Sequence, residues 1–169
     1  MGSMLALRRG EVAVIALTIF GIVACGSGRS HPAPVGAPVP QVGSVVVAVS
    51  PDLPADRRDR LTKLGATFML KGALEAALAR AGKLDAQSPI ALQVDITKFR
   101  MRSGATVFWL GVMAGGDFLD VRAAAHDGDR TLRQVETGAG SMGGFAGLTQ
   151  DSRFEHLARA VADRVTKDL

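Results

Sequence analysis

The sequence contains a single cysteine, Cys25, and this scarcity limits the sites that the chain can build. One cysteine forms no disulfide within the chain and supplies no zinc site made of several thiolates. The three histidines, His31, His126 and His156, lie far apart and match no metal-binding spacing such as HExxH. We therefore expect no bound metal ion.

Aromatic residues and clustered charges are also scarce. Tyrosine is missing, tryptophan occurs once, and aromatic residues make up 5% of the chain. The formal net charge is only +4, and no run of lysine and arginine forms the basic stripe that is typical of nucleic-acid-binding proteins. The sequence thus predicts an aliphatic core and no nucleic-acid partner.

The motifs of two large enzyme classes are missing as well. The chain has no GxSxG nucleophile elbow and no Gly-Lys-Ser/Thr of a phosphate-binding loop. We therefore predict a protein that is not an enzyme and that needs no cofactor.

The chain starts with the three parts of an export signal. Arg8 and Arg9 supply positive charge, residues 12–23 form an apolar run, and a small residue follows. The apolar run is shorter than the ~20 residues that a membrane-spanning helix needs. We therefore expect residues 1–24 to be a signal peptide.

The residues Ile22-Val23-Ala24-Cys25 resemble the lipobox of bacterial lipoproteins. The resemblance implies a diacylglycerol on the Cys25 thiol, a cut between Ala24 and Cys25, and an N-acyl chain on the new amino group. Because each buried CH₂ contributes ~0.8 kcal/mol, two or three chains anchor a protein durably. An ordinary secretory signal with an incidental cysteine and an uncleaved membrane anchor are the alternatives.

The residues after Cys25 indicate where the protein is held. In Gram-negative lipoproteins, an aspartate next to the cysteine typically retains the protein in the inner membrane, whereas this chain has Gly26. We therefore expect the protein to be anchored in the outer membrane, on the side facing the periplasm. Residues 25–42 comprise the lipidated cysteine and a tether rich in proline and glycine, and residues 43–169 form a single α+β domain.

Hydrophobic periodicity predicts the elements of the first half of this domain. Residues 45–49 are β-branched and read as a buried strand. Residues 65–81 have an apolar stripe at helical spacing and end at Gly82, a typical helix-terminating residue. Residues 90–97 alternate as a strand, and a slip in the alternation predicts a β-bulge near Thr97–Lys98.

The second half continues with two strands and a helix. Residues 119–126 and 130–137 form a hairpin around a type I′ turn at Asp127-Gly128. Residues 151–169 form a helix whose capping box is Ser152 to Glu155. The predicted order is β-α-β-β-β-α, a small, mainly antiparallel sheet with both helices packed on one face.

Three regions are candidates for contact with a partner. The apolar segment 105–114 is either core or an exposed patch. Three cations share one predicted strand face, which either binds an anion or is merely solvated. The glycine-rich segment 138–148 packs down or contacts a partner. The candidate partner-binding residues are Phe108, Trp109, Leu110, Met113, Lys98, Arg100, Arg102, Met142 and Phe145.

From Ile90 onward, several motifs resemble a family of small bacterial envelope lipoproteins of unknown function. They are Lys98-Phe99-Arg100, Phe108-Trp109-Leu110-Gly111, Ala114-Gly115-Gly116-Asp117, Leu119-Asp120-Val121 and Asp127-Gly128. Such proteins are similar to the small α+β domains at the N-terminus of TolB and in lipoprotein activators of peptidoglycan synthases. The resemblance implies a binding module facing the envelope, and it carries no catalytic residue.

The sequence as a whole predicts a membrane-anchored, non-catalytic binding or assembly module of the cell envelope. Its partner is another envelope protein or peptidoglycan. One alternative is a small periplasmic hydrolase, which a deep cleft pairing His126 or His156 with a carboxylate would favour. The other is a structural subunit that oligomerises through residues 105–114.

Overall fold

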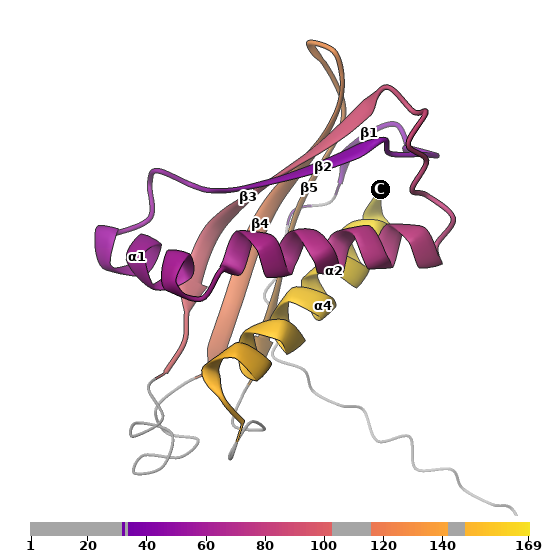
Figure 1. Ribbon diagram of the computed structural model, residues 1–169. Coiled ribbons are helices and arrows are strands. Elements are labelled where there is room, and N and C mark those ends of the chain that lie inside the picture. Colours follow the sequence, from indigo (N-terminus) through magenta and orange to yellow (C-terminus); the bar gives the residue numbers. More distant parts are fainter. Residues whose placement is uncertain (1–31, 33, 103–115, 142–147) are drawn as a thin grey trace, which may run out of the picture.

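The computed structural model describes residues 32, 34–102, 116–141 and 148–169. These residues form the α+β fold that the sequence predicts (Figure 1). The elements are β1 (Val35–Gly36), β2 (Ser44–Val49), α1 (Ala55–Lys63), α2 (Ala66–Arg80), β3 (Ile90–Arg100), β4 (Asp117–Asp127), β5 (Arg130–Ser141) and α4 (Gln150–Asp168).

The sheet has the strand order β1-β5-β4-β3-β2. Three of its pairings are antiparallel, and β2 pairs with β3 in parallel. The parallel pair arises because α1 and α2 carry the chain back between these two strands, as parallel pairing requires a long crossover. The sheet is therefore mixed, and α2 and α4 cross the same face of it (Figure 1).

The core lies between this face and the helices. Strand residues at every second position point into it, among them Leu92, Val94 and Ile96 of β3. The register of β3 with β4 shifts between Ile96 and Lys98, which confirms the predicted bulge. The extra residue keeps the side chain of Phe99 in the core after the slip, because Phe99 is 1% exposed.

The helix α2 ends as predicted. Its apolar stripe is buried at Leu70, Leu74 and Leu78. At its end, Gly82 has a left-handed φ of 67°. The Gly82 N–H donates to Ala79 O at 3.1 Å, and the Lys83 N–H donates to Leu78 O at 2.8 Å. This pair of bonds is the Schellman motif, which satisfies carbonyls that the helix leaves open.

The helix α4 begins earlier than the sequence predicts. Its N-cap is Thr149, whose hydroxyl oxygen accepts a hydrogen bond from the Ser152 N–H at 3.2 Å. The predicted capping box at Ser152 is therefore wrong, because this residue lies inside the first turn. The stripe of Phe154, Leu157 and Val161 is buried as predicted.

We expect Thr149→Ala to destabilise the domain by about 1 kcal/mol, since it removes an N-cap acceptor. Ser152→Ala is the matched control and should cost less, because the Ser152 hydroxyl accepts from the Thr149 hydroxyl at 3.0 Å and caps no main-chain N–H of the helix. Chemical denaturation followed by circular dichroism measures both. A larger loss with Ser152→Ala would place the cap at Ser152 after all.

Residues 35–42 belong to the fold, which corrects the end of the predicted tether. β1 pairs with β5, and Val39 and Val42 are 2% and 0% exposed. The Val39 N–H donates to Leu169 O at 2.6 Å, and the Val42 N–H donates to Lys83 O at 2.7 Å. The prolines nearby gave this stretch the composition of a linker, but two valines fix it to the core.

Arg133 of β5 ties this segment to the end of α4. Its Nη1 donates to Gly36 O at 2.6 Å. Its Nε and Nη2 donate to Asp168 O at 2.9 and 2.6 Å. One guanidinium group thus holds the main chain of β1 and the last turn of α4 together.

The hairpin between β4 and β5 differs from the prediction by one residue. Asp127 pairs with Arg130, so the turn comprises Gly128 and Asp129. Gly128 has a φ of 55°, and Asp129 does not have a positive φ. A positive φ at the first central position alone is typical of a type II′ turn, not of the predicted type I′ turn.

Candidate functional site

Both loop segments that we predicted as contact regions join the sheet at the same end. Asp117, the first residue of β4, lies next to segment 103–115 in the chain. Ser141, the last residue of β5, precedes segment 142–147. Asp117 and Ser141 are direct register partners. The stems of the two segments therefore lie side by side.

The candidate contact residues in these segments fall outside the described residues. They are Phe108, Trp109, Leu110, Met113, Met142 and Phe145. Ala24 and Cys25 fall outside the described residues too. Their roles stay predictions.

Two of the three cations that the sequence predicts on one strand face do lie on that face. Lys98 and Arg100 are exposed near the end of β3. Arg102 is not on this face, because it lies beyond the strand and is only 4% exposed. The expectation that three cations share one strand face is therefore wrong for Arg102, whose charge is compensated by a partner in the interior.

That partner is Asp117, which binds two arginines. Arg102 donates to Asp117 Oδ1 from its backbone N at 2.9 Å and from its Nε at 3.2 Å. Arg153 donates from Nη1 to Asp117 Oδ2 at 2.8 Å, and from Nη2 to Arg102 O at 2.7 Å. Asp117 is 0% exposed and Arg153 is 2% exposed. We call Arg102, Asp117 and Arg153 the ion cluster.

The ion cluster has more positive than negative charge. It contains two guanidinium groups and one carboxylate, and Arg153 Nε has no hydrogen-bond acceptor. The adjoining residues 103–116 and 142–149 include no aspartate or glutamate. Asp117 is the carboxylate that both buried arginines contact, and through Arg153 it links the start of β4 to the first turn of α4.

An aromatic contact supports the same junction. The rings of Phe99 and Phe154 meet edge to face, with centroids 6.1 Å apart. Phe154 follows Arg153 in α4, and Phe99 precedes Arg102 by three residues. The end of β3 is thus joined to α4 by this ring contact, and Arg102 just beyond β3 by the hydrogen bond from Arg153 Nη2.

Arginines of α1 cover the edge of β3 where β2 has ended. Arg57 donates to Phe99 O, and Arg60 donates to Met101 O at 3.0 Å. At the opposite edge of the sheet, Arg164 of α4 likewise donates to a main-chain carbonyl, Gly138 O of β5. Guanidinium groups thus occupy edge carbonyls that would otherwise be open to another strand.

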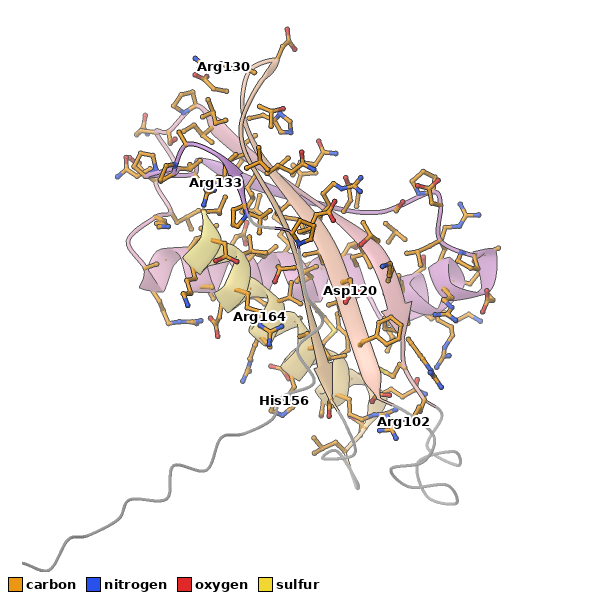
Figure 2. The ribbon with its side chains drawn as sticks, turned by 180° about the vertical axis from the view of Figure 1, so that it is seen from behind. Arg102, Asp120, Arg130, Arg133, His156 and Arg164 are labelled. Atoms are coloured by element: carbon orange, nitrogen blue, oxygen red, sulfur yellow. The ribbon has the colours of Figure 1, made fainter. Side chains whose placement is uncertain are left out.

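The sheet face away from the helices carries mixed charges. Asp95, Arg122 and Glu136 are register neighbours across β3, β4 and β5, and Arg122 Nε lies 2.8 Å from Glu136 Oε1. Asp120 lies near the middle of this face (Figure 2). A Cβ atom at residue 138 would approach Asp120 Oδ1 to 2.3 Å, which explains the glycine there.

The two described histidines lie on different elements, β4 and α4. His126 Nδ1 lies 3.2 Å from the hydroxyl oxygen of Thr131, close to the hairpin turn. His156 is exposed on α4. Among the described residues, no three His, Cys, Asp or Glu side chains gather as metal ligands do. Likewise, no helix in the described ranges has the length and apolarity needed to cross a membrane.

Sequence reasoning missed the ion cluster, although two signals point to it. Asp117 has the same alternation as Leu119 and Val121, so it starts the buried face of β4 with an acid. Arg153 lies four residues before Leu157, on the edge of the apolar stripe of α4. A charge at a position that the periodicity assigns to the core indicates a buried ion pair.

No protein-family model matches the sequence, and no curated protein matches it either. Several solved structures are similar in fold. They include the PelC dodecamer from Paraburkholderia phytofirmans, with 15% identity, 83% of this chain and 95% of that chain covered, and a TM-score of 0.48. A DUF330 protein from Xanthomonas campestris has 17% identity, coverages of 81% and 90%, and a TM-score of 0.37.

A minor lipoprotein from Acinetobacter baumannii has 14% identity, coverages of 76% and 88%, and a TM-score of 0.29. These are likenesses of fold only.

Proposed function

We propose that this protein is a lipid-anchored, non-catalytic binding module of the bacterial cell envelope, held on the outer membrane and facing the periplasm. The observation that carries the proposal is the lipobox Ile22-Val23-Ala24-Cys25, placed a few residues before a folded domain. The partner is another envelope protein or peptidoglycan.

The start of the fold sets how far the domain reaches from the membrane. Only residues 26–34 lie between Cys25 and the first residue of β1. At ~3.1 Å per residue in a polyproline-like state, this link spans on the order of 30 Å. The domain therefore works close to the membrane surface.

The arrangement of the candidate residues supports a contact region at one end of the sheet. The ion cluster joins the two ends of segment 103–115 there, and strand pairing places Ser141, before segment 142–147, beside Asp117. Lys98 and Arg100 are exposed on the neighbouring stretch of β3. A rigid scaffold that presents loop segments is a common arrangement for binding.

The anchor is tested by the mass and location of the protein. Wild-type protein from membranes should begin at Cys25 and carry the mass of two or three acyl chains. Cys25→Ser should lose this mass and leave the membrane fraction, because nothing remains to place hydrocarbon in the bilayer. Intact-mass spectrometry after membrane fractionation measures both.

Gly26→Asp is the matched control for this experiment. It should keep the lipid mass and move the protein to the inner-membrane fraction of a density gradient. An unmodified wild-type chain, or one that still carries residues 1–24, would overturn the proposed anchor.

A further inference from the structure

We propose that α2 packs antiparallel against α2 of a second copy of this chain, across a twofold axis between Ala73 and Leu74. The inference rests on the proposed membrane anchor and concerns a different surface from the loop segments. This surface is the outer side of α2, which faces away from the sheet. No described element passes in front of it (Figure 1).

The outer side of α2 carries an exposed aromatic ring. Phe68 is 83% exposed, whereas Leu70, Leu74 and Leu78 on the inner side of the same helix are 0% exposed. Among the described residues, Phe68 is the most exposed of the large apolar side chains. The ring contributes little to the core, and a partner that covered it would remove a large apolar area from water.

Gly72, one turn after Phe68, has no reason to be a glycine within the chain itself. Its φ is not positive, and a Cβ atom at this position would have no atom within 4 Å. A glycine inside a helix makes that helix less stable than an alanine would. A second helix that approaches the main chain closely accounts for the glycine, because a larger side chain would hold the two helices apart.

The shapes of the side chains fit a second α2 in one register. With the axis between residues 73 and 74, Phe68 lies opposite Ala79 of the partner subunit, so the large ring covers a small residue. Gly72 lies opposite Ala76 of the partner subunit, close to the axis, where the two helices come nearest to each other. Gly72, Ala76 and Ala79 are all exposed, so this side of the helix is open to a partner.

The charges of α2 favour a second copy in the same register. Lys71 and Glu75 lie on one flank of the outer side, and their side chains are 48% and 42% exposed. In the antiparallel pair, Lys71 faces the partner's Glu75, and the twofold axis repeats this contact with the roles exchanged. A parallel copy would instead bring lysine to lysine and glutamate to glutamate. The positions of the two charges therefore match those of an antiparallel copy of the same helix.

The membrane anchor explains how such a small contact can be sufficient. One pair of short helices is a small interface beside the ~1,200–2,000 Å² that stable complexes bury. Chains held on one membrane meet at a higher effective concentration, and an axis along the membrane normal leaves both Cys25 anchors on the same side. We therefore expect dimers on the membrane and monomers in dilute solution.

Disulfide crosslinking of the full chain in membranes tests this register. The double variant Gly72→Cys/Ala76→Cys places thiols opposite each other on the two helices, and should give a crosslinked dimer under mild oxidation. Wild type is one control. Gln93→Cys is the other, because Gln93 is exposed on the sheet face away from the helices. Both controls should stay monomeric.

A charge series in the same cysteine background provides a second measurement. Lys71→Glu places like charges opposite each other at both contacts, and should lower the crosslink yield roughly fivefold. Lys71→Glu/Glu75→Lys exchanges the two charges and should restore the yield. Equal yields from these two variants would show that the register is wrong.

The membrane fraction separates a failure of the dimer from a failure of the anchor. Protein that is present in this fraction but forms no crosslink would overturn the dimer and leave the anchor intact. Protein that is absent from the fraction would overturn the anchor, and with it the dimer that depends on the anchor.

Discussion

Asp117→Asn is expected to destabilise the domain by about 3 to 5 kcal/mol, the effect of breaking a buried ion pair from one side. Asparagine keeps the shape of the side chain and one acceptor oxygen, so it leaves no cavity. It removes the negative charge that Arg102 and Arg153 share, and both guanidinium groups are almost completely buried. The loss is thus electrostatic, since the group that both buried cations contact is no longer charged.

Thermal and urea unfolding measure this effect, and the melting temperature should fall by roughly 10 to 20 °C. Asp127→Asn is the matched control, because Asp127 ends the same strand in an exposed position. It should change stability by less than ~0.5 kcal/mol. Equal stabilities of the two variants would show that the ion cluster contributes little to the fold.

Phe154→Ala is expected to destabilise the domain by about 3 to 5 kcal/mol for a different reason. Phe154 is 0% exposed and contacts the ring of Phe99 edge to face. Alanine removes this contact and leaves a cavity between the end of β3 and α4. The helical propensity of alanine is high, so the loss does not come from α4 itself.

Phe68→Ala is the control for the same chemical change. Phe68 lies in α2 but is 83% exposed, so its removal leaves no cavity. Its melting temperature should stay within ~2 °C of the wild type. If both phenylalanine variants melted together with the wild type, the junction of β3 with α4 would have to depend on other contacts.

Local patterns were sufficient for most of the secondary structure. The stripe of Leu70, Leu74 and Leu78 and the terminal Gly82 place α2 almost to the residue, because spacing and capping act within a few residues of the chain. The bulge near Thr97–Lys98 could also be predicted, since a slip in alternation would otherwise turn Phe99 toward the solvent.

Contacts between segments that are distant in the sequence could not be predicted from such local patterns. Arg102 looked like the third cation of a strand face, and only its meeting with Asp117 and Arg153, 15 and 51 residues away, buries it. Val39 and Val42 lie among prolines, so they showed no periodicity, although the fold buries both. A charge pair or an isolated valine becomes part of the core only through tertiary contacts.

The way Arg133 holds Gly36 and Asp168 determines how the domain would respond to force. If the chain is anchored at Cys25, any pull between the membrane and a bound partner enters the fold through β1. β1 is two residues long, and it would peel easily from β5 on its own. The hydrogen bonds of Arg133 to Gly36 O and Asp168 O transmit part of this force to the main chain of α4. The hydrogen bond from the Val39 N–H to Leu169 O transmits another part to the residue after α4. The force is therefore divided between β5 and α4, so the point where the chain enters the fold resists peeling better than β1 would alone.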